Sequence, residues 1–424
     1  MILSFSWVLS LPAQAEYRYQ LTPSISVGEV YDDNIDLSRD NKKSDYITGA
    51  TPGIDFHILS RKTSLRIKYA PTFVRYARES GNNTTRHSAN LDLSRQLSRH
   101  WSLDLSDTFL RSEDPLEDVL DLAGVRTTRN IYKNNDATAG FRYQFGPENV
   151  LSFGYRHGLR ENSQPDLDDW TTQEFFSHVD YWPDVKNGLS IHYAYTRGDF
   201  SRDDLSNAGE DYTGFTTGLS YHYRFSPHTR CDVRYEFTKR DFEIPLDRAG
   251  EGPDESYNAH NMTVGMEHAF SRHFTAALRG GYYLQKRETA GDEGGPLYEV
   301  SLNRTFRHGS LTFGGDGGWH ESYIDDSRRG FIRYNGVRAR LAYQFLKELR
   351  GHAEGAYQVN RDSLSMEWKT YRGSSGLQWS FMRWYALSLD YTYARRSGDD
   401  HTQDYTDNRV MLRLTFQRPY IWRD

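Results

Sequence analysis

The sequence predicts an all-β fold, a transmembrane antiparallel β-barrel of the up-and-down kind with about 18–20 strands. Three observations predict it: the composition, a two-residue alternation of apolar and polar side chains, and a repeated strand–turn–strand unit. Of 424 residues only 37% are hydrophobic, yet 14% are aromatic and 30 are Tyr, and the mean hydropathy is -0.79. Soluble cores need more aliphatic residues, and disordered chains have few aromatics. Strands with a single apolar face explain both the low hydrophobic fraction and the high aromatic fraction.

Strict alternation runs through many segments, including residues 65–70, 189–195 and 337–345. Successive side chains of a strand point to opposite faces, so the apolar residues share one face and the charged residues share the other. After residue 15, no uncharged apolar stretch approaches the roughly 20 residues that a transmembrane helix needs. Two residues break the alternation, which predicts a β-bulge at Asp107 and a position near a turn for Arg95.

The repeated unit has two long strands joined by a very short turn, followed by a longer acidic loop. A soluble propeller also repeats at about 40 residues but would show four short strands per repeat. A large apolar residue adjoins nearly every short turn, and aromatic rings favour the membrane–water boundary. This placement predicts a periplasmic aromatic girdle. Its predicted members are Trp101, Phe145, Trp182, Phe225, Phe270, Phe306, Phe345, Phe381 and Trp384.

Counting strands gives 20, from about 17–31, 44–60 and 63–77 to about 383–396 and 404–416. An even number places both termini on the short-turn side, which is periplasmic in bacterial barrels. Residues 1–15 predict a secretory signal peptide with an A-x-A cleavage site, which leaves 16–424 as a single barrel domain. The most apolar external loop, 115–125, is expected to fold over or into the mouth of the barrel.

The face opposite to the apolar one is expected to line a polar lumen. Opposite charges there commonly pair across strands and support the wall, which is the simplest role for any single residue. Taken together, a slight excess of basic residues favours a path for an anionic or hydroxyl-rich solute. The predicted lumen-lining residues are Arg66, Lys68, Arg156, Arg160, Arg234, Glu236, Arg338, Arg340, Arg350, Glu354 and Arg413.

The sequence predicts no catalytic, metal or cofactor site. His192, His222 and His352 are expected to point inward, but no G-x-S-x-G or H-E-x-x-H motif accompanies them. The acidic loops lack the spacing of a calcium-binding loop. Cys231 is the single cysteine, so no intramolecular disulfide can form. A formal net charge of -6 is too weak to imply nucleic-acid binding.

The N-terminal stretch over about residues 20–60 has distinctive motifs. Tyr31, Asp32, Asp33 and Asn34 form a turn after the first strand, and Ser44-Asp45-Tyr46 and Thr51-Pro52-Gly53 follow. This stretch resembles the opening of the putative β-barrel porin 2 family, outer-membrane proteins associated with exopolysaccharide biosynthesis and export clusters. The resemblance implies the cell outer membrane of a Gram-negative bacterium and a periplasmic polysaccharide export protein as partner. Related export barrels have 18 strands, so a count of 20 departs from them.

The function that follows from the resemblance is a passive outer-membrane channel for secretion of an exopolysaccharide, working with periplasmic export partners. Two alternatives stay open: a general or solute-selective diffusion porin, and a structural sheath around a partner protein. Other expected partners are outer-membrane lipid, lipopolysaccharide and the barrel assembly machinery. That machinery reads a C-terminal strand signal that segment 410–416 resembles, and Tyr420 and Trp422 continue the parity of its terminal Phe416.

Overall fold

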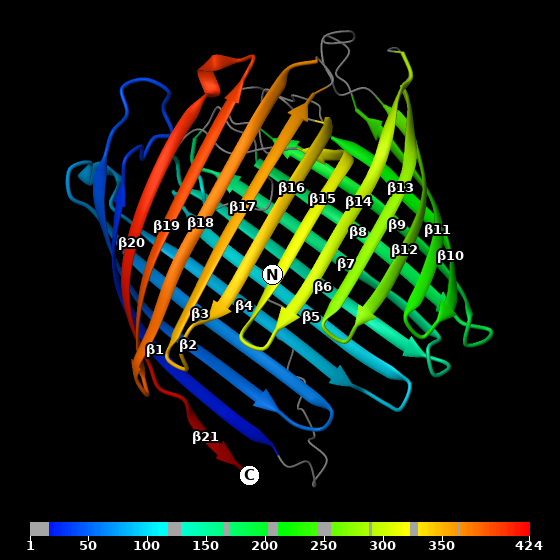
Figure 1. Cartoon of the computed structure of the whole chain (residues 1–424), viewed down its shortest axis with the longest axis horizontal. Coiled ribbons are helices and arrows are strands. Elements are labelled where there is room, and N and C mark those ends of the chain that lie inside the picture. Colours follow the sequence, from blue (N-terminus) through cyan, green and yellow to red (C-terminus); the bar gives the residue numbers. More distant parts are fainter. Residues whose placement is uncertain are drawn as a thin grey trace, which may run out of the picture.

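The computed structural model describes residues 17–117, 129–164, 169–201, 211–243, 256–287, 291–322, 330–362 and 365–424. Across these residues, twenty long strands form one closed antiparallel sheet, and a short final strand extends it (Figure 1). This confirms the predicted barrel and its strand count. The predicted signal peptide, 1–15, lies outside the described residues.

Every strand of the first half of the barrel pairs with its sequence neighbours. The predicted limits of the first strands differ from the observed ones by one residue or so. The strands are β1 (Arg18–Asp32), β2 (Asp45–Leu59), β3 (Thr63–Tyr76), β4 (Thr84–Gln96), β5 (Trp101–Ser112), β6 (Tyr132–Gln144), β7 (Val150–Asn162), β8 (Asp169–Tyr181), β9 (Asn187–Ser201) and β10 (Tyr212–Ser226).

The second half continues the same antiparallel order up to the closing strands. The strands are β11 (Thr229–Phe242), β12 (Tyr257–Ser271), β13 (Phe274–Arg287), β14 (Glu293–Phe306), β15 (Gly309–Ser322), β16 (Gly330–Gln344), β17 (Leu349–Arg361), β18 (Glu367–Met382), β19 (Tyr385–Gly398), β20 (Tyr405–Gln417) and β21 (Tyr420–Arg423). Two single-turn 3₁₀ segments, Ser80–Asn82 and His401–Gln403, are the helical elements of the described residues, and neither could span a membrane.

The barrel closes between its first and last strands. β1 pairs with β20 over Ser24–Asp32 and with β21 over Arg18–Leu21, so the chain end extends the closing ladder. Trp422 of β21 stacks on Tyr19 with ring centroids 5.6 Å apart. In Figure 1 the short turns lie at one end of the barrel together with β21, and the described longer connections, such as 33–44 and 77–83, lie at the other end. By the rule for bacterial barrels, the short-turn end is periplasmic and the long-loop end is extracellular.

Alternation along each strand separates two faces. Apolar side chains such as Val264, Met262 and Leu278 are more than half exposed, because they face outward where lipid would cover them. Buried apolar side chains are few and gather inside the extracellular end. One group is Ile35, Ile47, Val74 and Tyr76, and another is Leu37, Leu116, Ala394 and Tyr405. The interior is therefore packed where loops fold in, rather than along its whole length.

The predicted bulge at Asp107 is wrong. Asp107 pairs in continuous register with Leu91 on one side and Ala137 on the other, so its carboxylate lies on the outward, exposed face. The amide of Asn135, from the outward face of β6, donates a 2.6 Å hydrogen bond to it. A neighbouring polar side chain, not a backbone irregularity, accommodates this charge. Arg95 lies one residue before the end of β4, as expected for a cation near a turn.

The two faces should respond differently to the same substitution. Leu341→Arg puts a cation on the outward face and should lower the free energy of unfolding by about 2–4 kcal/mol. Ala342→Arg, one residue further on the inward face, should cost much less because its guanidinium can remain hydrated. Urea unfolding of both variants in lipid vesicles measures the difference. Equal destabilisation would contradict the assignment of the faces.

Candidate functional site: the narrowed mouth and the polar wall

The Tyr31–Asn34 turn joins the first hairpin to the last strand. The Asp33 carboxylate accepts hydrogen bonds from the backbone N and from Nδ2 of Asn408, each 2.7 Å long. Nδ2 of Asn34 donates to the Thr406 carbonyl at 2.9 Å. Tyr31 points outward and packs on Tyr46, with ring centroids 5.1 Å apart. The turn that suggested the family resemblance thus fixes the extracellular end of the β1–β20 seam.

A buried ion network continues inward from this turn. We call it the mouth network, and it comprises Asp32, Arg86, Glu113, Asp114, Arg129, Asp407 and Arg409. Arg409 of β20 lies at its centre, 2.7 Å from Asp114, 3.0 Å from Asp32 and 2.9 Å from Asp407. Arg86 of β4 lies 2.6 Å from Glu113, and Arg129 lies 3.6 Å from the same carboxylate. Each of the three arginines therefore lies beside at least one carboxylate, which offsets the cost of burying its charge.

The network draws the segment after β5 across the mouth. Asp114 follows β5 by two residues, yet its ion-pair partner Arg409 belongs to β20, on the far side of β1 to β4. Leu116 packs with Leu37, Ala394 and Tyr405 inside the barrel. The prediction that loop 115–125 folds into the mouth is confirmed for its described part, Pro115–Glu117. Residues 118–125 lie outside the described residues.

The charge of Asp114 depends on its neighbours. Burial alone would raise the pKa of its carboxyl group, but the positive charges of Arg409, Arg129 and Arg86 outweigh burial and hold the pKa well below its usual range. The carboxylate therefore remains ionised and attached to Arg409 at any physiological pH.

A second element narrows the mouth from the other side. The end of the β15–β16 hairpin leans inward, where Glu321 lies 3.0 Å from Arg240 of β11 and accepts a hydrogen bond from Tyr257 of β12. Trp319 stacks on Phe331 with centroids 4.8 Å apart, and its Nε1 donates to Asn261 at 3.0 Å. These contacts span four strands of the barrel wall, so the hairpin end covers part of the lumen.

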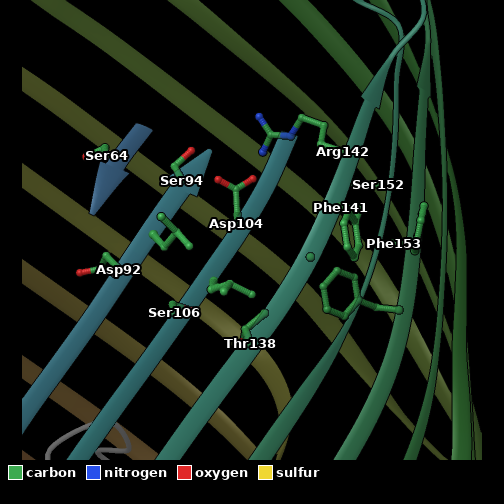
Figure 2. Close-up of a pocket in the computed structure, with 14 residues that line it drawn as sticks. Ser64, Asp92, Ser94, Asp104, Ser106, Thr138, Phe141, Arg142, Ser152 and Phe153 are labelled. Carbon is green, nitrogen blue, oxygen red and sulfur yellow. The ribbon is translucent and has the colours of Figure 1, made fainter. Parts of the chain in front are cut away.

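Below the mouth, the inner wall of β3 to β7 contains a recess of about 420 Å³. Small hydroxyl side chains line it, together with two carboxylates, one cation and the apolar side chains of Leu93, Leu105, Phe141, Phe153 and Phe176. Figure 2 shows the Arg142 side chain extending from β6 toward Asp104 of β5. The polar lining residues are Ser64, Asp92, Ser94, Asp104, Ser106, Thr138, Arg142 and Ser152.

A second recess of about 350 Å³ continues the first toward the periplasmic end. Ser64, Ser94 and Arg142 line both recesses, so the two form one polar track along the wall. The periplasmic part adds Arg61, Lys62 and Arg99. Strand parity places Asp92, Asp104 and Arg142 on the inward face, whereas Arg61, Lys62 and Arg99 lie in turns, where parity predicts nothing. The hydroxyl residues were not predicted, although Ser102, Ser106 and Thr138 follow the same two-residue period.

The predicted lumen-lining residues all lie on the face opposite to the exposed apolar side chains. Several form the cross-strand pairs expected of a supported wall: Arg66 with Asp55 at 2.6 Å, and Arg156 with Glu174 at 2.9 Å. Arg160 is buried over the ring of Tyr132 at 5.3 Å. Other members belong to weaker pairs or to none among the described residues. Those in weaker pairs are Arg234 with Asp232, Glu236 with His192, and Arg340 with Glu354. Those in no ion pair among the described residues are Lys68, Arg338, Arg350 and Arg413.

The predicted aromatic girdle is observed in part. Phe145, Phe225, Phe270, Phe306 and Phe345 are exposed next to short turns, and Trp101 and Phe381 are partly exposed there. Trp182 does not join them. Its ring stacks on His222 of the inward face and lies beneath the Arg224 guanidinium at 3.7 Å. The bare backbone of Gly188 makes room for it, and Tyr181 takes the outward position. Trp384 lies in its turn beside Arg383.

The inward histidines pair with carboxylates or hydroxyl groups. His192 lies 3.3 Å from Glu236, and His352 lies 3.9 Å from Asp390. His222 lies 3.1 Å from the Ser190 hydroxyl, which is also 2.5 Å from Asp180. A serine that donates to a carboxylate is not activated by the histidine beside it. Asp32, Asp33 and Asp407 form a group of three carboxylates, but the Arg409 guanidinium already lies within 3.0 Å of two of them.

Removing the central cation should weaken the barrel. Arg409→Met leaves Asp114, Asp32 and Asp407 buried without their shared partner, which should cost about 3–5 kcal/mol of unfolding free energy. Arg413→Met, four residues along the same inward face, is the matched control because Arg413 forms no ion pair among the described residues. Urea unfolding followed by tryptophan fluorescence measures both. Similar losses for the two variants would show that the network is not stabilising.

The mouth should open only in strong acid. The pKa of the Asp114 carboxyl group is lower in the folded protein than in the unfolded chain, where it is 3.8. The carboxylate therefore stabilises the folded loop above pH 3.8, and this stabilisation is lost as the pH falls through the lower pKa of the folded protein. The Asp114 contacts should therefore hold from neutral pH down to about pH 4, and single-channel conductance should rise most steeply below it. Asp114→Asn should raise conductance already at neutral pH. If the Asp114→Asn variant had the same conductance as the native protein both at neutral pH and in acid, this loop would not be a constriction.

Similar folds occur among solved structures. The siderophore receptor PirA from Pseudomonas aeruginosa matches with a TM-score of 0.54 and 10% identity, over 94% of this chain and 80% of that chain. The ferric citrate transporter FecA matches with a TM-score of 0.53 and 10% identity, over 93% and 78%. PirA from Acinetobacter baumannii gives 0.52 and 8%, over 94% and 80%. At such identities the likeness shows the fold alone. No curated protein matches the sequence.

A family model matches residues 187–418, more than half of the chain. The match excludes the Tyr31–Asn34 turn on which the resemblance rested, but it includes Thr406, Asn408 and Arg409, the residues that this turn contacts. Fold and family together indicate a porin-like barrel of the Gram-negative outer membrane. The chain belongs to the family described as "Putative beta-barrel porin 2".

Proposed function

We propose that the protein is a diffusion channel selective for small hydroxylated solutes. The polar track along β3 to β7 is the observation that supports this most directly. Serine and threonine hydroxyls, carboxylates and an arginine offer both donors and acceptors, which suit the many hydroxyl groups of a sugar-like solute. The ring of Phe176 adds an apolar surface against which the C–H face of such a solute can pack.

The size of the solute follows from the mouth. A 20-strand barrel without inward loops would leave a wide aqueous path. Here the segment after β5 and the end of the β15–β16 hairpin both fold inward and are held by buried ion pairs. A narrowed entrance favours small solutes over folded proteins or bulk flow, because each solute must pass the constriction before it reaches the track.

Export of an exopolysaccharide stays a prediction of the family resemblance. The same hydroxyl-lined track could contact sugar units of a polymer, but the narrowed mouth favours the smaller solute. Deleting the gene and measuring surface polysaccharide and sugar uptake in the same strain separates the two functions. Unchanged polysaccharide with reduced uptake supports the diffusion channel, and lost polysaccharide with normal uptake supports export.

The track can be tested against a matched site elsewhere on the inner wall. Asp104→Leu with Ser106→Val removes polar groups from the recess and should lower the rate of sugar uptake about tenfold, the effect of losing one or two net hydrogen bonds. The control is Ser388→Val with Asp390→Leu on β19, which has the same residue types and spacing. Liposome swelling in sugar solutions measures both. Equal rates in the two double variants would contradict the proposal.

A further inference from the structure

The barrel wall separates between β14 and β15 near its extracellular end. The two strands pair from Phe306 and Gly309 up to Tyr298 and Gly317, and no further. Beyond that point β14 pairs only with β13, and β15 pairs only with β16. The inward lean of the β15–β16 hairpin explains the separation. Gly318 lies at the branch point, where a Cβ atom would come within 2.6 Å of the Leu297 side chain.

A recess of about 350 Å³ occupies the place that the hairpin vacates. Glycine backbone forms much of one side, where β14 contributes Gly294 and Gly295 and β15 contributes Gly318. The other side comes from β16 and β17. Four of its residues belong to the outer face of the barrel, because they alternate in step with the exposed Val337 or with its partners on β17. They are Arg333, Asn335, Val359 and Arg361.

The recess is positively charged. Arg333 lies 2.7 Å from Glu293 across the separated strands, and Arg287 shares that carboxylate at 3.3 Å. Arg361 lies 3.1 Å from Glu367, which Lys369 also approaches at 3.6 Å. Of the charged residues that line the recess itself, two are cations, Arg333 and Arg361, and one is a carboxylate, Glu367, which leaves a net charge of two minus one, or +1. An anion placed there would balance the excess.

Polar groups suited to hydroxyls surround the same space. Tyr283, Tyr334 and the fully buried Asn360 also line it, and their parity is that of the inward face, so the recess reaches through the separated wall. The Asn360 carbonyl accepts a hydrogen bond from Gln358 at 2.6 Å, but its Nδ2 has no hydrogen-bond partner among the described residues. A buried donor without a partner is unfavourable unless a ligand or water satisfies it. The lining therefore matches an anion that also has hydroxyl groups.

The height of the recess indicates where that anion comes from. Outward tyrosines lie just below it, Tyr282 and Tyr298 on one side and Tyr357 and Tyr371 on the other. Outward tyrosines mark the boundary between hydrocarbon and headgroups. The long-loop end of the barrel is extracellular, so the recess opens at the level of the outer-leaflet headgroups.

We propose that this recess binds the anionic sugar headgroup of an outer-leaflet glycolipid. The two arginines neutralise its phosphate or carboxylate, and Asn360 and the tyrosines hydrogen-bond to its hydroxyls. The glycine backbone lets the headgroup approach the wall closely. Binding would also fill the opening that the leaning hairpin leaves between β14 and β15.

The test compares two pairs of outward cations. Arg333→Gln with Arg361→Gln removes the charge of the recess. Lys133→Gln with Arg197→Gln is the control, because both residues lie on the outer face of other strands at the same end, each paired to a carboxylate. Barrels extracted in mild detergent are analysed for retained lipopolysaccharide by native mass spectrometry. The recess variant should retain at least about tenfold less than the native barrel, and the control should retain the native amount.

Further variants and probes make the result decisive. Arg333→Lys with Arg361→Lys keeps the charge and should recover most of the retained glycolipid, and migration of unheated samples on gels reports folding of all variants. Equal retention by recess and control variants would overturn the proposal. The proposal would also be overturned if native barrels kept no lipopolysaccharide on extraction but bound glucose 1-phosphate in the recess. The ligand would then be a free sugar anion and not a glycolipid. Sugar uptake through the lumen is a separate measurement, so failure here leaves the proposed channel untouched.

Discussion

The structure depends on one constraint, that no backbone hydrogen-bonding group may remain unpaired in hydrocarbon. The sheet must therefore close, and the closing pair joins residues nearly 400 positions apart in a chain of 424. Backbone pairing between β1 and β20 satisfies the wall itself. Side chains of Asp33 and Asn34 then fix the extracellular end of the seam, while Trp422 and Tyr19 extend it at the periplasmic end.

Closure leaves an interior that is filled only where loops enter it. At the mouth, charged residues from β1, β4, β20 and the segment after β5 meet out of water. Burial of so many ions is tolerable only because each carboxylate faces an arginine, and Arg409 serves three of them. A single buried ion pair, between Glu321 and Arg240, holds the β15–β16 hairpin inward in the same way. Inward folding on that side also explains why the wall separates beside β14.

The two polar regions of this barrel differ in what they present. The track inside β3 to β7 is lined by hydroxyl groups and mixed charges, whereas the recess outside β14 to β17 has a net positive charge. The first region faces the lumen, and the second opens where β14 and β15 separate. The same strand alternation that hides polar residues from lipid over most of the wall stops near the extracellular end, where both faces can be polar.

The sequence alone determined the barrel, its twenty strands and the inward face of its charged residues, because two-residue periodicity and short turns are local signals. It also indicated that loop 115–125 folds over or into the mouth, and its described residues, 115–117, do so. The partner of Asp114, the inward ring of Trp182 and the outward pair of Asp107 with Asn135 were decided only by the tertiary structure. Each depends on which distant strands become neighbours, and on space left by residues such as Gly188. Local periodicity contains no information about such contacts, since closure of the whole sheet creates them.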